Sequence, residues 1–320
     1  MKEHLILKKT AAILSFVLLL LLSGCFTGVE STPRISNADV RRETKNDGRV
    51  FSEHEEKIAS RIVSPPPAQW RRGERFIVCD PKISHTFNST PGNILPAEGD
   101  TIVFVGFENV RNIMGQSATN VKLVSERGDT LTYRIDAPVE NILERKSLDI
   151  PFTISLRMAE RADSILKGTR AYVTTAYRYN SSDGKRIERR RFQPVTISSV
   201  KSGNVELPLR VFFKEKGNGA DEEFFLWMTP GASRTSTRNF PALFSLSDPR
   251  EKYPAITDEV WNAITMSRVI PDMTKQECRL ALGSPSEVIR GHSYSSVYER
   301  WIYQDGINLI FEDGLLKSVR

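Results

Sequence analysis

The chain has 320 residues, of which 39% are hydrophobic and 26% charged, and its formal net charge is +6. These values are close to those of ordinary globular domains, and a chain of this length is expected to form two or three of them. The positive charge is mild and spread along the sequence. It suits a surface near anionic lipid or cell-wall polymer, but it gives no indication of nucleic-acid binding.

Residues 1–24 have the layout of a secretory signal peptide. Three lysines precede an apolar run from Ala11 to Leu22, which is shorter than the roughly 20 residues that a membrane-spanning helix needs. The segment Leu22-Ser23-Gly24-Cys25 resembles the bacterial lipoprotein box. This resemblance implies cleavage before Cys25, a diacylglycerol on its thiol and acylation of the new amine. The alternatives are an uncleaved anchor and an ordinary signal with a chance cysteine.

The residue after Cys25 helps to predict whether the lipid anchors the protein in the inner or the outer membrane. In Gram-negative lipoproteins an aspartate at this place often retains the protein in the inner membrane, whereas this chain has Phe26. We therefore expect an envelope protein that is anchored to the outer membrane and faces the periplasm. Residues 25–67 are polar and end in three prolines, which predicts a flexible tether. Within it, Ile58 and Ile62 are four residues apart and favour a short helix.

Two stretches, 68–155 and 156–245, contain short apolar strands separated by glycine, aspartate and proline, and each predicts a β domain. The second stretch repeats the plan of the first, since Lys167 to Val173 resembles Arg72 to Val78. The repeat predicts duplication of one small β module, with an SH3-like barrel as its form. The alternative is two unrelated short β domains.

The last part of the chain, 255–320, predicts two helices followed by three strands. Thr257 begins the first helix and Thr274 the second, where Glu277 completes a capping box. Asp-Gly pairs join the strands, which are expected at 298–304, 307–312 and 315–319. The fold is therefore predicted to be mainly β with a C-terminal α+β domain: two small SH3-like β modules, then a two-helix, three-stranded antiparallel module.

The loop length decides which side chains of this C-terminal sheet face the helices. Two-residue loops at the Asp-Gly pairs predict the opposed pairs Ile302–Leu309 and Phe311–Leu316, on the covered face. The other face then exposes Trp301, Tyr303 and Ile310. Exposed aromatic side chains are common anchors of protein interfaces, so these three are candidate partner-binding residues. The alternative is that they pack on the β domains of the same chain.

The segment 269–285 resembles the signature of the SmpA/OmlA (BamE-like) family: a Gly-Met-Thr, a short helix and Leu-Gly-x-Pro, with Asp272 in place of the glycine. Residues 301–303 and 311–316 look like the family's Trp-x-Tyr and Phe-x-x-Gly-x-Leu patterns. The resemblance covers 255–320 and implies two helices on a three-stranded sheet. It also implies an envelope location and protein binding, because the family's known role is as an outer-membrane lipoprotein subunit of the β-barrel assembly machine in Gram-negative bacteria.

The sequence contains no recognisable catalytic or metal-binding motif. It has no His-Glu-x-x-His, no cysteine pair with metal spacing and no Gly-x-Ser-x-Gly. We expect Cys79 to be a core thiol and His85 a solvated loop histidine. The alternative is that Cys79 acts as a nucleophile and His85 as its base. Cys79 and Cys278 lie in separate predicted domains, which favours free thiols over a disulfide. We therefore expect no enzymatic activity, no metal and no cofactor.

Two functions fit these observations. The first is a membrane-anchored scaffold or assembly factor that binds other envelope proteins, in outer-membrane protein assembly. The alternative is a lipoprotein that binds the cell wall or another glycan through the SH3-like modules, in a groove lined by Tyr172, Tyr177, Tyr179 or Trp227. The basic run 185–191 is a further candidate for binding anionic lipid or polymer, although the preceding Asp-Gly favours a solvated β-hairpin.

Overall fold

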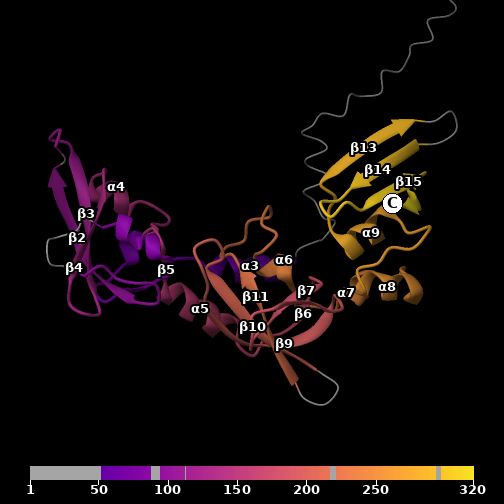
Figure 1. Ribbon diagram of the computed structural model, residues 1–320, viewed down its shortest axis with the longest axis horizontal. Coiled ribbons are helices and arrows are strands. Elements are labelled where there is room, and N and C mark those ends of the chain that lie inside the picture. The colour runs from indigo at the N-terminus through magenta and orange to yellow at the C-terminus, as the bar shows by residue number, and fades with distance from the viewer. Residues whose placement is uncertain (1–51, 88–93, 112, 217–220, 293–296) are drawn as a thin grey trace, which may run out of the picture. The chain divides into compact units, whose positions relative to one another are not determined.

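The computed structural model describes residues 52–87, 94–111, 113–216, 221–292 and 297–320, which all belong to one compact unit, Thr44–Arg320. Their strands form three antiparallel sheets of five, seven and four members (Figure 1). Each sheet has its own hydrophobic cluster, because one face of each is apolar. The predicted signal peptide and Cys25 lie outside the described residues.

The predicted fold class is wrong. Two small SH3-like modules and a two-helix, three-stranded module were expected, whereas the sheets have five, seven and four strands. The strands that sequence reasoning missed are short or weakly apolar: β5 has three residues, β12 has two, and β13 has the mixed sequence EVIRGH. Such segments lack the alternation that identifies a strand in a sequence, and only their pairing with neighbours makes them strands.

The first sheet has the strand order β4-β3-β2-β1-β5. Its members are β1 (Arg75–Val78), β2 (Thr101–Arg111), β3 (Ser117–Ser125), β4 (Thr130–Ile135) and β5 (Thr153–Ser155). The same part of the chain contains the short helices η1 (Pro67–Gln69), η2 (Pro81–His85) and α4 (Val139–Leu143). Alternate residues such as Phe76, Ile102 and Val121 are buried in one cluster. A register shift between Phe104 and Gly106 interrupts the pairing of β2 with β3, as a β-bulge does.

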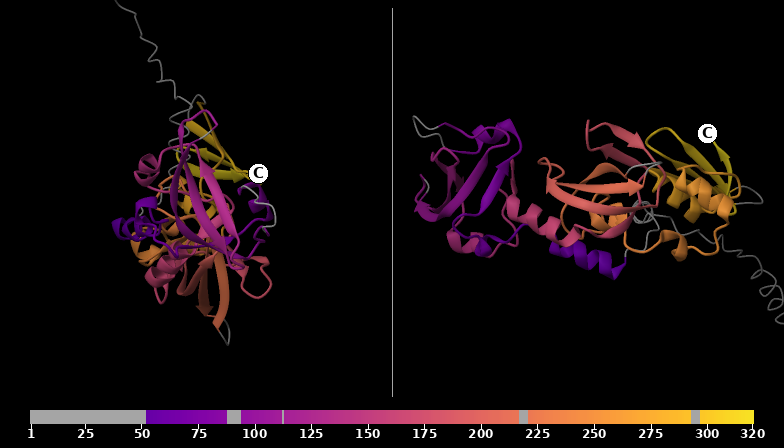
Figure 2. Two further views of the ribbon diagram at one scale, coloured as in Figure 1. Left: turned by 90° about the vertical axis from the view of Figure 1, so that its left-hand side faces the viewer. Right: turned by 90° about the horizontal axis from the view of Figure 1, so that it is seen from below.

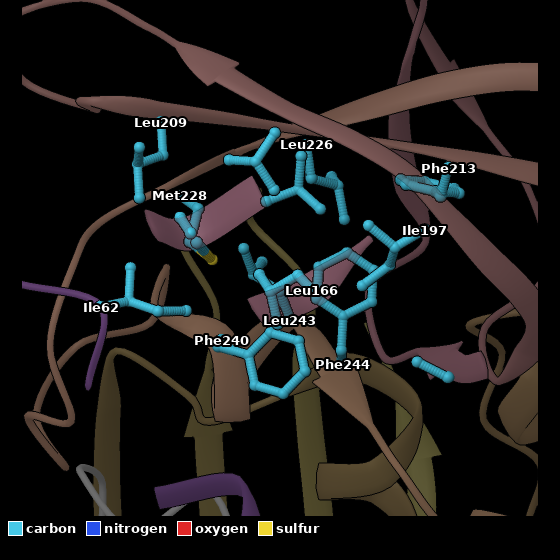
Figure 3. Close-up of a cluster of buried hydrophobic side chains, with 14 of the residues drawn as sticks. Ile62, Leu166, Ile197, Leu209, Phe213, Leu226, Met228, Phe240, Leu243 and Phe244 are labelled. Atoms are coloured by element: carbon cyan, nitrogen blue, oxygen red, sulfur yellow. The ribbon is translucent and has the colours of Figure 1, made fainter. Parts of the chain in front are cut away.

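The second sheet has the order β12-β6-β9-β10-β11-β7-β8. Its members are β6 (Arg170–Val173), β7 (Tyr177–Asn180), β8 (Arg186–Glu188), β9 (Gln193–Ser202), β10 (Leu209–Lys216), β11 (Asp221–Met228) and β12 (Phe244–Ser245). One face packs on α5 (Leu156–Leu166) and α6 (Phe240–Leu243), and Figure 3 shows this cluster. Helix α5 contributes Met158, Ala162 and Leu166, which recur every four residues and form one apolar stripe.

The two larger sheets share one connectivity. Strand β1 lies between β2 and β5, and β6 correspondingly lies between β9 and β12. The meander β2-β3-β4 of the first sheet matches β9-β10-β11 of the second. The hairpin β7–β8 follows β6 in the chain and extends the second sheet at the β11 edge. The predicted repetition of one β plan is therefore seen in the strand order, although the second sheet has two additional strands.

The predicted flexible tether is wrong for its last part, 52–67. Helix α3 (Glu53–Arg61) begins with a capping box between Ser52 and Glu55. The Glu55 carboxylate is buried and accepts a hydrogen bond of 2.8 Å from the Leu246 backbone N–H. Ala59 and Ile62 are 1% exposed and join the cluster of the second sheet. This helix is therefore part of the fold, because a buried apolar stripe stabilises it.

The C-terminal part contains α7 (Pro249–Lys252), α8 (Asp258–Thr265), α9 (Lys275–Leu282) and the strands β13 (Glu287–His292), β14 (Val297–Ile302), β15 (Asn308–Glu312) and β16 (Leu315–Val319). The predicted capping box at Thr274 is confirmed: Glu277 N–H donates to Thr274 Oγ1 over 3.3 Å, and Thr274 N–H donates to Glu277 Oε2 over 2.7 Å. Helices α8 and α9 cover the apolar face of the sheet (Figure 2). Asp272 has φ +63°, a conformation that favours glycine and is also tolerated by aspartate.

Candidate functional site

The predicted partner-binding aromatics are core residues. Trp301 is 0% exposed and Tyr303 is 8% exposed, and both pack in the cluster under α8 and α9. Ile310 is half-buried and lies opposite Arg300. These side chains therefore do not form an exposed aromatic surface. The alternative, packing on the β domains of the same chain, is also wrong, because Trp301 and Tyr303 pack under α8 and α9 of their own part of the chain.

The reason is a difference of one residue in the loop between β14 and β15. Tyr303 N–H donates to Ile307 O over 2.9 Å, so the loop has three residues, and its last one, Gly306, has φ +89°. Trp301 therefore lies opposite Leu309, where a two-residue loop would have placed Ile302. A shift of one residue moves each side chain to the other face of a strand. At the other hairpin the predicted pair Phe311–Leu316 is confirmed.

The polar ends of the buried aromatics have partners. Trp301 Nε1 donates to Glu299 Oε2 over 3.1 Å, and Tyr303 Oη donates to Gly283 O over 3.2 Å. Glu299 also accepts hydrogen bonds from Lys275 Nζ at 2.7 Å and from Arg290 Nε at 3.0 Å. Burial alone would raise the pKa of Glu299, but these bonds and charges hold it below its ordinary value. These bonds connect α9, β13 and β14 and stabilise the C-terminal core.

The two described cysteines are free thiols, as predicted. Burial raises the pKa of Cys79 to about 11 and that of Cys278 to about 12. The Cys79 thiol donates to the Phe152 carbonyl over 3.2 Å, and His85 is exposed on η2. A thiol with so high a pKa is a poor nucleophile, so this geometry does not favour the Cys79–His85 alternative. Among the residues that the structure describes, no group of three or more His, Cys, Asp or Glu side chains could hold a metal ion.

The basic run 185–191 forms strand β8 and the chain that follows it. Arg189 pairs with Glu222, Arg190 Nη1 donates to Asn262 Oδ1 over 3.2 Å, and Arg191 Nε donates to Ser267 Oγ over 3.0 Å. The Arg186 guanidinium lies 3.7 Å from the centre of the Tyr177 ring. These arginines are thus engaged within the chain, which weakens the interpretation of the run as an independent polymer-binding segment.

The seven-stranded sheet has a second face, opposite the cluster in Figure 3, and we call it the outer face. Successive side chains of a strand alternate between faces, so the outer residues follow from the pairing of the strands. Phe212 lies opposite both Ser199 and Phe225, and Phe225 lies opposite Tyr179. One half of the face, which we call the aromatic half, consists of Tyr179, Lys201, Arg210, Phe212, Phe225 and Trp227.

The rings of the aromatic half form a continuous row. The centre of the Phe225 ring is 5.3 Å from that of Tyr179, 5.3 Å from that of Phe212 and 5.6 Å from that of Trp227. Phe212 and Phe225 are buried beneath their neighbours, whereas Tyr179 and Trp227 are half-exposed. The Arg210 guanidinium lies 5.7 Å from the ring centres of both Phe212 and Trp227. The row therefore presents flat apolar rings beside fixed positive charge.

The other half of the outer face is hollowed into an open cavity of about 610 Å³. Its outer-face lining includes Arg170, Tyr172, Pro194, Thr196, Lys214, Lys216 and, opposite Lys216, the carboxylate of Asp221. Arg170 lies opposite Thr196, and Thr196 opposite Lys214, so three neighbouring strands bring these side chains together. Burial is the main cause that raises the pKa of Tyr172, and the nearby carboxylates of Asp248 and Glu251 raise it further. We call this half the cavity half.

The four residues proposed for a glycan groove all lie on the outer face. Tyr172 of β6 lies opposite Pro194, Tyr179 of β7 opposite Phe225, and Trp227 of β11 opposite Arg210. Tyr177 is two residues before Tyr179 on β7 and therefore has the same orientation. Sequence reasoning missed Lys201, Arg170 and the alternation Arg210, Phe212, Lys214. The alternation of basic and aromatic residues along β10 was a detectable signal, since a half-buried strand normally alternates apolar with polar residues.

Comparison with known proteins adds no relative. A scan against protein-family models and searches of the curated proteins and of the solved structures found no match for this chain. In the part of the chain that the structure describes, no helix is long and apolar enough to cross a membrane.

Proposed function

We propose that the chain is a non-enzymatic binding protein of the cell envelope, anchored by lipid on Cys25, and that its outer face binds a glycan. The observation that carries the proposal is the row of rings that joins Tyr179 and Trp227 through Phe225. The C–H face of a sugar ring is apolar and packs on such a ring, while its hydroxyls need polar neighbours at the rim. Arg210 and Lys201 supply those neighbours.

The arrangement of the face supports binding of an extended chain. Same-face residues repeat about every 7 Å along a strand and neighbouring strands lie about 5 Å apart, which is comparable to the size of one sugar unit. The aromatic half and the cavity half adjoin on β10, where Phe212 and Lys214 are two residues apart. A polymer of several sugar units could therefore contact both halves. Peptidoglycan of the cell wall is the first candidate ligand, because the predicted lipid anchor would place the face beside it.

Co-sedimentation with purified peptidoglycan tests this function. The lipidated full chain should sediment with the polymer, and Trp227→Ala and Tyr179→Ala should each weaken binding by about tenfold, as truncating a central aromatic contact often does. Tyr298→Ala is the matched control, because Tyr298 is an exposed tyrosine of the C-terminal sheet. Binding that is equal in all four proteins, or absent in the unmodified one, would contradict the proposal.

A protein-binding scaffold, acting in outer-membrane protein assembly, is the second candidate, and the first sheet favours it. Ile113 and Met114 lie between β2 and β3 and are 105% and 85% exposed. Large apolar side chains that protrude at a loop are frequent interface contacts. A photo-crosslinking residue at position 113, used in intact cells, should then capture one partner protein, whereas one at exposed Glu98 should not. Recovery of no protein at either position would refute this candidate.

A further inference from the structure

The cavity half of the outer face contains a group of basic side chains that the strand pairing brings together. Arg170 on β6, Thr196 on β9 and Lys214 on β10 are directly opposed. Neighbouring strands lie about 5 Å apart, so the Cα atoms of the two basic residues are about 10 Å apart on either side of the threonine. An anion above Thr196 is within reach of both long side chains and of the threonine hydroxyl. Lys216 follows Lys214 on the same face and lines the same cavity.

Two of these cations lie opposite carboxylates of β11, Lys216 opposite Asp221 and Lys214 opposite Glu223, but no ion pair is formed there. None of Arg170, Lys214 and Lys216 forms an ion pair with another residue of the described ranges. Glu223 lies opposite Lys214, but its Oε1 accepts a hydrogen bond of 2.7 Å from Ser198 Oγ. Cations held close together repel one another, and a bound anion reduces this repulsion.

The kind of anion follows from the number and chemistry of the groups. Arg170, Thr196 and Lys214 offer three donor groups, and a phosphate group offers three accepting oxygens and about two negative charges at neutral pH, more than one carboxylate does. The planar guanidinium of Arg170 can bind two phosphate oxygens at once, and lysine acts as a point charge. The threonine hydroxyl donates a further hydrogen bond. A volume of about 610 Å³ also leaves room for a sugar unit next to the phosphate.

We propose that the cavity half binds the phosphate group of a phosphorylated glycan, with Arg170, Thr196 and Lys214 as its contacts. The inference rests on the proposed function, because it assigns the sugar units of the same ligand to the adjoining aromatic half. It predicts that phosphorylated units of an envelope glycan bind more tightly than unphosphorylated units.

Binding of small probes to the full chain tests this. Glucosamine 1-phosphate, glucosamine and inorganic phosphate are titrated separately, and the shifts of backbone amide NMR signals are followed. Glucosamine 1-phosphate should bind at least about tenfold more tightly than glucosamine and should shift signals of β6, β9 and β10. The variants Arg170→Gln and Lys214→Gln should each lose this difference. Lys167→Gln, which changes an exposed lysine just before β6, is the control and should keep it.

Three results would overturn the inference. The first is equal affinity for glucosamine and its phosphate, and the second is unchanged phosphate preference in both variants. The third is inorganic phosphate or vesicles of phosphatidylglycerol binding as tightly as the sugar phosphate, which would assign the cavity to a free anion or a lipid headgroup. Retained, Trp227-dependent binding of peptidoglycan in these cases would show that only the phosphate contact is wrong. Loss of peptidoglycan binding would refute the proposed function itself.

Discussion

Replacing Trp301 with alanine tests whether this side chain belongs to the core or to a surface. The indole is 0% exposed and packs on Phe311, with 4.7 Å between ring centres. Truncating a buried tryptophan costs about 3–5 kcal/mol. The substitution also removes the hydrogen bond from Nε1 to Glu299 and the contact with the Arg279 guanidinium, which lies 4.7 Å from the ring centre. Both losses add to this cost. An exposed anchor would cost less than about 1 kcal/mol.

Amide hydrogen exchange of β15 is the suitable assay. The chain has three separate hydrophobic clusters, so its unfolding need not be a single transition, whereas local exchange reports on one sheet. Trp301→Ala should speed exchange in β15 by about two to four powers of ten, and exchange in the first sheet should not change. Ile310→Ala, on the other face of the same sheet, should have a much smaller effect. A larger increase of β15 exchange in Ile310→Ala than in Trp301→Ala would refute the three-residue loop and the register derived from it.

Three other predictions concern acid stability, backbone packing and thiol reactivity. Because the folded-state pKa of Glu299 lies below its ordinary value of 4.5, this carboxylate stabilises the C-terminal sheet above that pH. Its contribution is lost as the pH falls further, so the protection of the β14 amides relative to their intrinsic exchange rates should fall on acidification, and less so in Glu299→Gln. Gly203→Ala should destabilise the second sheet by about 1–3 kcal/mol, measured by amide exchange of β9 and β10, because the new methyl carbon would lie 2.1 Å from Leu207 O. Gly106→Ala in the first sheet, where no atom lies within 4 Å of the new methyl carbon, is the control and should leave exchange in β2 and β3 unchanged. Iodoacetamide at pH 8 should modify both described cysteines far more slowly than free cysteine, with buried Cys278 the slower; rapid labelling would contradict the raised pKa values of about 11 and about 12.

Sequence reasoning was reliable where the signal is contained in a few neighbouring residues. The capping box of α9 needs only Thr274 and Glu277, which lie three residues apart and satisfy each other's backbone groups. The Asp313–Gly314 turn likewise depends on two residues, both with positive φ, and it places Phe311 opposite Leu316. These interactions form regardless of the rest of the chain, so the sequence by itself determined them.

The candidate site could be predicted only in part. Tyr179 and Trp227 were named from the sequence because aromatic residues in strands are common binding residues. Their partner Phe225, and the cations Arg170 and Lys214, were not named, since these three residues belong to three different strands and share a face only through the register. The interpretation of Trp301 failed for a related reason, because one additional loop residue reverses the faces of a whole strand.

What the sequence determined by itself was local: caps, tight turns, the apolar stripes of the helices and the alternation within long strands. The tertiary structure alone decided the strand order, the additional short strands β5 and β12, and the side chains that meet on the outer face. Strands of two or three residues form only when neighbours already present a matching edge of hydrogen-bonding groups. A binding face that spans β6 to β11 depends on those non-local pairings, so its composition follows from the fold and not from any one segment.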